Sequence, residues 1–202
     1  MQWYENEVKW LETSLAARPK PEGSSKGPLV FYGSSSIRLW NTLGADFPNE
    51  DAVNVGFGGS TLLACAYFFE RLVDPLHPRA MVFYAGDNDL GDGRSVKQVL
   101  DAYKELMWKV GRDLGPLPFA FIGIKPSIAR WNIIDRIRAV NSAVKADLAA
   151  RPDSYFVEIE GAMMGPDGRP NAALFEPDGL HLSPEGYRVW TACVRAQAAP
   201  LL

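Results

Sequence analysis

The sequence predicts an α/β protein with three layers, in which helices cover both faces of a five-stranded parallel sheet. Three observations lead to this prediction: short apolar segments rich in β-branched and aromatic residues, helical periodicities between them, and a regular alternation of the two along the chain. The apolar segments, bounded by Gly or Pro, cover residues 28–33, 51–56, 80–86, 118–124 and 154–160.

Amphipathic helical patterns lie between and after these predicted strands. Apolar residues recur at three- and four-residue spacing over residues 62–73, 95–111 and 133–150. A last helix is expected over 183–197, because Ser183 is a suitable N-cap residue and Pro184 suits the first helical position.

The whole chain, residues 1–202, is expected to form one domain. Its length, with 47% hydrophobic and 22% charged residues, suits a globular protein with a full core. A helix near residues 2–16, carrying Trp3 and Trp10, precedes the first strand and is expected to pack on the sheet or on a partner. A connection rich in Pro, Gly and Ser follows over 16–27, so residues 1–22 form an N-terminal helix and linker.

Charge and cysteine usage exclude several classes of protein. A formal net charge of -3 argues against a nucleic-acid partner, which usually requires a basic patch. Cys65 and Cys193 lie far apart without a ligand cluster, so both are interpreted as apolar core residues. We find neither an export signal nor an apolar run long enough to span a membrane, and we expect a cytoplasmic protein. A homodimer is left open.

The loops after the predicted strands are where a ligand site is expected, because open parallel sheets bind ligands outside the carboxyl ends of their strands. These loops read GSSSI, GFGGST, GDNDLGDG, KPSIARW and EPDGLHLS, over residues 33–37, 56–61, 86–93, 125–131 and 176–183.

A serine in the first loop needs a base to become a nucleophile, and the base is most often a histidine oriented by a third group. The chain has two histidines. His77 precedes the third strand, at its amino end, and is interpreted as a surface or capping residue. His181 lies in the last loop, and Asp178, three residues earlier, can fold back onto its ring.

Other loop chemistries do not fit the spacing. In GFGGST, Thr61 occupies the sixth position of a dinucleotide-binding loop, where glycine belongs. A calcium loop counted from Asp87 would place Asp92 where the turn glycine belongs and Gln98 where the bidentate glutamate belongs. Ile37 breaks the nucleophile elbow of the α/β-hydrolases. No metal and no cofactor is implied.

Four segments together resemble a known family. FYGSSSI, NVGFGGST, YAGDND and DGLH, in this order, are similar to the four blocks of the SGNH, or GDSL-like, lipase and acylhydrolase family. The reading GSSSIR-W, with KPS at residues 125–127, resembles a bacterial branch related to platelet-activating-factor acetylhydrolase-like esterases. The resemblance implies a flavodoxin-like, three-layer α/β/α fold with a five-stranded parallel sheet.

The resemblance also implies roles for individual residues. It assigns Ser35 as the nucleophile, His181 as the base and Asp178 as its orienting acid. It assigns the oxyanion hole to Ser35, Gly59 and Asn88. Ser34 stands where the family has Asp, and its hydroxyl is expected to make the corresponding hydrogen bond in the loop.

The function implied is a serine esterase that cleaves carboxylic esters, with short-chain or acetyl groups favoured, through an acyl-serine intermediate. Its partner is a small-molecule ester. A thioesterase, a lysophospholipase or an acyltransferase would use the same residues. A catalytically silent binding or scaffold protein is the non-enzymatic alternative, and its usual mark would be the loss of these residues, all of which are present.

Neighbouring residues are expected to support this site. Asp87 and Asp89 flank Asn88 and are expected to hold its loop by local hydrogen bonds. Trp40, after the serines, is interpreted as a packing residue more readily than as a substrate contact. For Met163, Met164 and Phe175 two interpretations stay open, the wall of an acyl pocket and ordinary loop packing.

Overall fold

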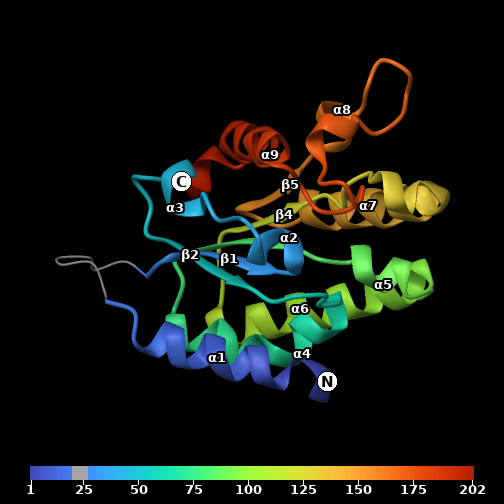
Figure 1. Cartoon of the computed structure of the whole chain (residues 1–202). Helices are drawn as coiled ribbons and strands as arrows, with labels where there is room; N and C mark the ends of the chain where they lie inside the picture. The colour runs from blue at the N-terminus through green and yellow to red at the C-terminus, as the bar shows by residue number, and fades with distance from the viewer. Residues whose placement is uncertain (20–26) are drawn as a thin grey trace.

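A five-stranded, all-parallel sheet forms the centre of the computed structural model, which describes residues 1–19 and 27–202 (Figure 1). The strands run in the order β2-β1-β3-β4-β5, which is the flavodoxin-like order, so the predicted fold class is confirmed. Their bounds are Leu29–Gly33 for β1, Ala52–Gly56 for β2, Ala80–Tyr84 for β3, Phe119–Ile122 for β4 and Ser154–Val157 for β5. Most of the predicted connection over 16–27 lies outside the described residues.

Helices connect the strands and cover the sheet. The main ones are α1 Glu5–Ala16, α4 Leu62–Leu72, α6 Val96–Leu114, α7 Ile134–Ala149 and α9 Pro184–Gln197. Short α-helices follow the strands and loops, namely α2 Ser35–Arg38, α3 Leu43–Asp46, α5 Asp87–Gly91 and α8 Glu160–Met163. Short 3-10 helices cover Gln2–Tyr4, Asp74–Leu76, Ile128–Ile133, Ala172–Leu174 and Ala199–Leu201.

The predicted and observed boundaries differ by three residues at two places and by one or two residues at several others. Helix α6 continues three residues beyond the predicted end at 111, because Leu114 still packs on the core. The last predicted strand ends early: β5 stops at Val157, and Glu160 begins α8. Ser183 caps α9 as predicted, since its hydroxyl accepts a hydrogen bond from the Gly186 N–H at 3.2 Å.

The two faces of the sheet pack into two separate cores. Val30 and Tyr32 of β1 point into a core shared with α1, α4, α6 and α7. Leu29 and Phe31 of the same strand point into a second core with α9 and the α2–α3 region. Figure 1 shows α1, α4 and α6 on one side of the sheet and α3 and α9 on the other. Trp40 is 1% exposed in the second core, which matches its interpretation as a packing residue.

The N-terminal helix packs against α4 and contributes Val8 and Leu11 to the first core. Trp3 and Trp10 face away from this contact, with 89% and 66% of their surfaces exposed. Cys65 is buried in α4 as predicted, whereas Cys193 is only half-buried at the edge of the second core. In the described part of the chain, no helix has both the length and the apolar character needed to cross a membrane.

The carboxyl end of β1 leaves no room for a side chain beside its neighbour β3. A Cβ atom at Gly33 would lie 1.9 Å from the carbonyl oxygen of Tyr84, and Gly33 has a φ of +146°, which other residues rarely adopt. Gly33 pairs with Gly56 on the opposite side, where a Cβ would lie 2.3 Å from the Arg38 N. Only glycine therefore fits at these two strand ends.

We expect Gly33→Ala to destabilise the fold by about 3 kcal/mol or more, because the methyl group would collide with main-chain atoms that cannot move independently of the sheet. Urea unfolding followed by circular dichroism measures the change. Gly44→Ala is the matched control, since Gly44 lies in α3 with open space around it. Alanine there should be neutral or stabilising by up to about 1 kcal/mol. Equal stabilities of the two variants would contradict the packing argument.

Candidate active site

Ser35, His181 and Asp178 lie in hydrogen-bond contact, although 146 residues separate the serine from the histidine. The Nε2 atom of His181 lies 3.2 Å from the Ser35 Oγ. The Nδ1 atom of the same ring lies 2.6 Å from Oδ2 of Asp178. The nucleophile, base and acid assigned from the sequence are therefore brought together in the order that a triad requires.

The loop that carries Asp178 and His181 is held by its own main chain. The second carboxylate oxygen of Asp178 accepts hydrogen bonds from the N–H groups of Leu180 at 2.8 Å and His181 at 2.9 Å. The Glu176 N–H donates to the His181 carbonyl at 2.8 Å, and this closes the turn. The hydrogen bond to His181, followed by the two main-chain bonds, lowers the pKa of Asp178 to about 2. Asp178 therefore stays a carboxylate at any pH at which the histidine could act as a base.

Ser35 is the first residue of α2, directly after the tight end of β1. Its position follows from Ser34, whose N–H donates to the Tyr84 carbonyl of β3 at 3.0 Å. The expected hydrogen bond from the Ser34 hydroxyl is not found as a helix cap: Ser34 is the N-cap residue of α2 but makes no side-chain capping bond. The hydrogen bond that ties this loop to β3 is therefore made by the Ser34 N–H, a main-chain group, and not by the Ser34 hydroxyl.

Gly59 lies in the loop after β2, and Asn88 lies in α5, the short helix that follows β3; β2 and β3 flank β1 on either side. Asn88 Nδ2 donates to the Ser60 carbonyl at 3.0 Å, and the Ser60 hydroxyl donates to the Gly33 carbonyl at 3.2 Å. This relay of two hydrogen bonds connects the three loops. Gly59 has a φ of +66°, and a Cβ there would meet nothing within 4 Å, so the space beside it is open.

The orientation of the Asn88 side chain is set by Arg130. The Arg130 Nη2 donates to Asn88 Oδ1 at 3.2 Å, and Nη1 of the same group donates to the Asp87 carbonyl at 2.7 Å. A carboxamide nitrogen carries two hydrogens, so Asn88 Nδ2 keeps a second donor besides the one given to Ser60. Gly91 leaves room for this arginine, since a Cβ there would lie 1.2 Å from Arg130 Nη1.

Asp87 and Asp89 do hold the Asn88 loop, but mainly by reaching other segments, so the prediction of local hydrogen bonds is wrong in its main part. Asp87 pairs with the buried Lys125 at 2.8 Å. Asp89 accepts from the first N–H of α4, that of Leu62, at 2.7 Å and pairs with Arg94 at 2.9 Å. Burial raises the pKa of Asp89, and these two contacts oppose that rise.

Lys125 is the centre of a buried polar cluster below the serine loop. It is 1% exposed, and its ammonium contacts Asp87, the Tyr84 hydroxyl at 3.0 Å and the Ser36 hydroxyl at 3.2 Å. Burial alone would lower the pKa of Lys125, but the Asp87 carboxylate and the other contacts outweigh burial and raise it. For Tyr84, burial raises the pKa to about 12. The cluster therefore contains a charged lysine and a neutral tyrosine.

Several expected residues lie elsewhere. His77 is exposed at the amino end of β3, where it ends a 3-10 turn, as predicted. Met163 and Phe175 are buried in the second core, and the indole of Trp190 donates to the Met163 sulfur at 3.4 Å. These contacts are the ones that the packing interpretation expects of the two residues. Met164 forms an isolated bridge with Pro170 in the following loop.

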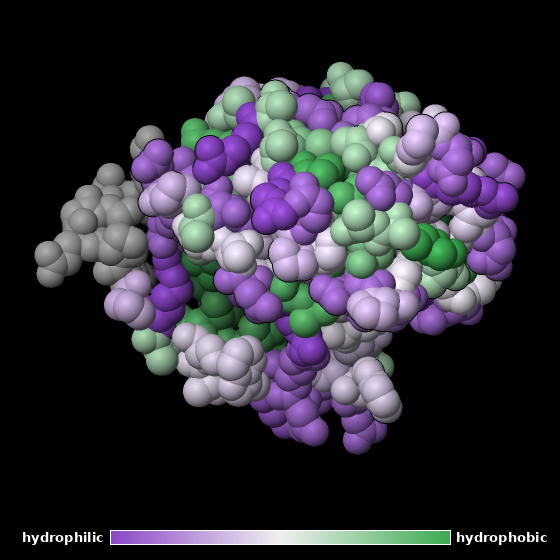
Figure 2. Space-filling view, turned by 45° about the horizontal axis from the view of Figure 1, so that its top comes forward, coloured by the Kyte–Doolittle hydropathy of each residue, from purple (hydrophilic) through white to green (hydrophobic). Residues whose placement is uncertain are grey.

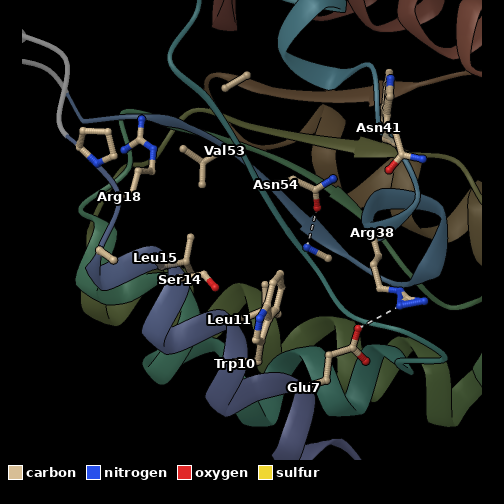
Figure 3. A pocket seen from close by; sticks show the side chains of 15 residues that line it. Glu7, Trp10, Leu11, Ser14, Leu15, Arg18, Arg38, Asn41, Val53 and Asn54 are labelled. Atoms are coloured by element: carbon tan, nitrogen blue, oxygen red, sulfur yellow. Dashed lines mark hydrogen bonds and ion pairs between the residues drawn. The ribbon is translucent and has the colours of Figure 1, made fainter.

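A groove of about 1010 Å³ lies between α1 and the edge strand β2. Figure 3 shows its lining, which includes Leu11 and Val53 on its walls and Glu7 opposite Arg38 at one end. None of the candidate residues Ser35, Gly59, Asn88, Asp178 and His181 lines it. In Figure 2, hydrophobic side chains lie in recesses between polar ones on the face that is displayed.

Sequence reasoning missed the roles of Arg130, Lys125 and Glu7 around the site. Lys125 belongs to the KPS segment, and its presence directly after a buried strand was the available signal. Arg130 and Glu7 act on loops that are 42 and 51 residues away, so no local pattern could indicate them.

Comparisons with known proteins agree with this geometry. Residues 22–189 match the GDSL-like Lipase/Acylhydrolase family. Platelet-activating factor acetylhydrolase IB subunit alpha1 from Bos taurus is 27% identical over 188 residues, which cover 89% of this chain and 78% of that protein.

Solved structures share the fold. A GDSL-like lipase from Bacteroides thetaiotaomicron superimposes with a TM-score of 0.80 at 21% identity, over 96% of this chain and 98% of that one. A catalytic mutant of an acetylxylan esterase from Geobacillus stearothermophilus gives a TM-score of 0.68 at 13% identity, over 86% and 94% of the two chains. The family match covers most of the chain and includes all five candidate residues, so this protein belongs to the GDSL-like lipase/acylhydrolase family of ester-cleaving hydrolases.

Proposed function

We propose that this protein is a serine esterase that removes short acyl groups, acetyl above all, from small-molecule esters through a covalent acyl-serine intermediate. The observation that carries the proposal is the unbroken contact from the Ser35 hydroxyl to His181 and on to Asp178, at 3.2 and 2.6 Å. A serine so connected can lose its proton to the ring as it attacks a carbonyl carbon.

The reaction proceeds in two balanced halves. The Ser35 Oγ attacks the ester carbonyl carbon while His181 Nε2 takes the hydroxyl proton, and Asp178 holds the resulting imidazolium. Collapse of the tetrahedral adduct breaks the bond to the alcohol, which leaves with the proton from His181. Water then attacks the acyl-serine, His181 takes a proton from that water, and the acid leaves as the proton returns to Ser35.

The negative charge on the carbonyl oxygen requires donors. Ser35 and Gly59 can supply main-chain N–H groups, which have no main-chain acceptor among the described residues, and Asn88 can supply its second amide hydrogen. Losing one such donor typically costs about 3 kcal/mol in the transition state. The open space beside Gly59 leaves room for the substrate carbonyl.

Two considerations favour a short acyl group. Met163 and Phe175, which could have walled a long acyl pocket, are buried in the core. The names of two similar proteins, an acetylhydrolase and an acetylxylan esterase, also refer to acetyl groups. A thioester substrate or transfer of the acyl group to an alcohol would use the same residues.

The first test is a panel of p-nitrophenyl esters from acetate to palmitate, together with acetylated sugars and acyl-CoA. We expect kcat/KM to be highest for acetate or butyrate and to fall by at least tenfold for chains of eight carbons or more. Ser35→Ala should abolish turnover and labelling by a fluorophosphonate probe, while Ser36→Ala should still be labelled. Label on Ser36, or turnover by Ser35→Ala, would refute the assignment of the nucleophile.

The ionisation of Asp178 should make the stability of the fold depend on pH. Because its pKa is lowered from 3.8 to about 2 in the folded protein, its carboxylate stabilises the fold at pH values above about 4, and this contribution disappears as the pH falls through about 2. Asp178→Asn should therefore be less stable than the wild type at pH 6, and the difference should narrow toward pH 2. Urea unfolding at several pH values measures this.

The same variant should lower kcat/KM by at least a hundredfold at pH 7, because the asparagine no longer fixes the proton position on the His181 ring. A variant with wild-type turnover, or a stability difference that grows as the pH falls, would remove Asp178 from this role.

The Asn88→Ala variant separates the proposed oxyanion role of Asn88 from a structural role. If its amide binds charge only in the transition state, Asn88→Ala should lower kcat and kcat/KM about a hundredfold with KM nearly unchanged. Activity is counted per active site by fluorophosphonate titration, so that unfolded protein does not contribute. Near-normal turnover per titrated site, with a lower Tm, would instead indicate a purely structural asparagine.

A further inference from the structure

The N-terminal helix contacts the loop that contains Gly59 on both sides of the peptide unit proposed to bind the oxyanion. The Glu7 carboxylate accepts a hydrogen bond from the Gly58 N–H at 2.9 Å. The Tyr4 hydroxyl donates to the Gly59 carbonyl at 3.2 Å. The Gly59 N–H belongs to the peptide unit between these two contacts, so α1 and the turn before it hold both of its neighbours.

This arrangement matters because two consecutive glycines flank that peptide unit. A glycine pair can rotate a peptide plane with little steric resistance, and a rotated plane would point a carbonyl oxygen instead of an N–H at the substrate. Gly58 is packed closely on its partners, since a Cβ there would lie 3.3 Å from Glu7 Oε2 and 3.4 Å from Arg38 Nε. Contacts from outside the loop must therefore supply the rigidity that the glycines lack.

Glu7 also reaches the segment that carries the nucleophile. Its other oxygen lies 3.4 Å from Nη1 of Arg38, at the end of α2 (Figure 3). An exposed ion pair of this kind contributes little stability by itself. The position of the Glu7 carboxylate is more important, because this one group contacts both the Gly59 loop and α2.

The helix that presents these groups is itself firmly attached. Arg71 of α4 forms ion pairs with Glu5 at 2.9 Å and with Glu12 at 2.7 Å. The Tyr4 ring packs edge-on against Phe57, the residue before Gly58, with 5.5 Å between ring centroids. The N-terminal segment is thus fixed to α4 on one side and to the glycine loop on the other.

We propose that Glu7, with Tyr4, is a positioning residue that keeps the Gly59 N–H directed at the oxyanion. This inference rests on the esterase function proposed above. It predicts that the N-terminal helix affects the rate of the chemical step although it contributes no group that touches the substrate.

The test compares four variants on the best short-chain ester. Glu7→Ala should lower kcat at least tenfold with KM within twofold of the wild type. Glu7→Gln should stay within threefold, because an amide oxygen can still accept from the Gly58 N–H. Tyr4→Phe should show a smaller loss than Glu7→Ala. Glu12→Ala is the matched control on the same helix, where the carboxylate faces Arg71 instead of the loop, and it should stay within twofold.

Hydrogen exchange of the Gly58 amide, followed by NMR, provides a readout that needs no substrate. Exchange should accelerate at least tenfold in Glu7→Ala and stay unchanged in Glu12→Ala. Equal kinetic losses in Glu7→Ala and Glu12→Ala would overturn the proposal in favour of simple helix docking, as would equal losses in the Ala and Gln variants in favour of the Arg38 charge. Faster exchange with unchanged kcat would also overturn it. A wild-type enzyme without turnover on any ester would instead refute the proposed function.

Discussion

The close approach of β1 to β3 at their carboxyl ends is the constraint on which the rest of the candidate site depends. With only a hydrogen atom at Gly33, the next N–H reaches the Tyr84 carbonyl at 3.0 Å and the chain turns directly into α2. Gly56 allows the same closeness on the other side, under Arg38. A side chain at Gly56 would push against α2, and one at Gly33 would push β1 away from β3. Either change would disturb the 3.2 Å contact between Ser35 and His181.

The buried Lys125 connects α2 to the carboxyl end of β3 and to the segment that follows it. A buried ion pair is weak evidence for stability, because removing two charges from water costs several kcal/mol per ion. The contribution of Lys125 here is to orient the groups around it. An ammonium has three donors, and Lys125 meets three acceptors, on Asp87, Tyr84 and Ser36, at 2.8, 3.0 and 3.2 Å. The loops after β3 and β4 and the helix α2 therefore share one set of hydrogen bonds that can be satisfied in one geometry.

The sequence was informative where function or structure is local. The strand and helix pattern predicted the sheet, because burial on both faces of a parallel strand leaves an apolar run. Asp178 and His181 could be paired from their spacing, since three residues in a short loop bring a carboxylate to a ring. The contacts of Asp87 with Lys125, of Asp89 with the Leu62 N–H and of Glu7 with the Gly58 N–H could not be predicted, because their partners lie at least 27 residues away.

This difference between local and distant contacts also divides the candidate site into two halves. The acid–base half lies within residues 175–182, where main-chain bonds inside the loop hold both groups. The proposed oxyanion half has no such independence, because Ser35, Gly59 and Asn88 follow three different strands, and the segments that carry them are held by Glu7, Arg130 and the Ser60 relay. Changes in distant helices should therefore affect the stabilisation of the oxyanion more strongly than they affect proton transfer by His181.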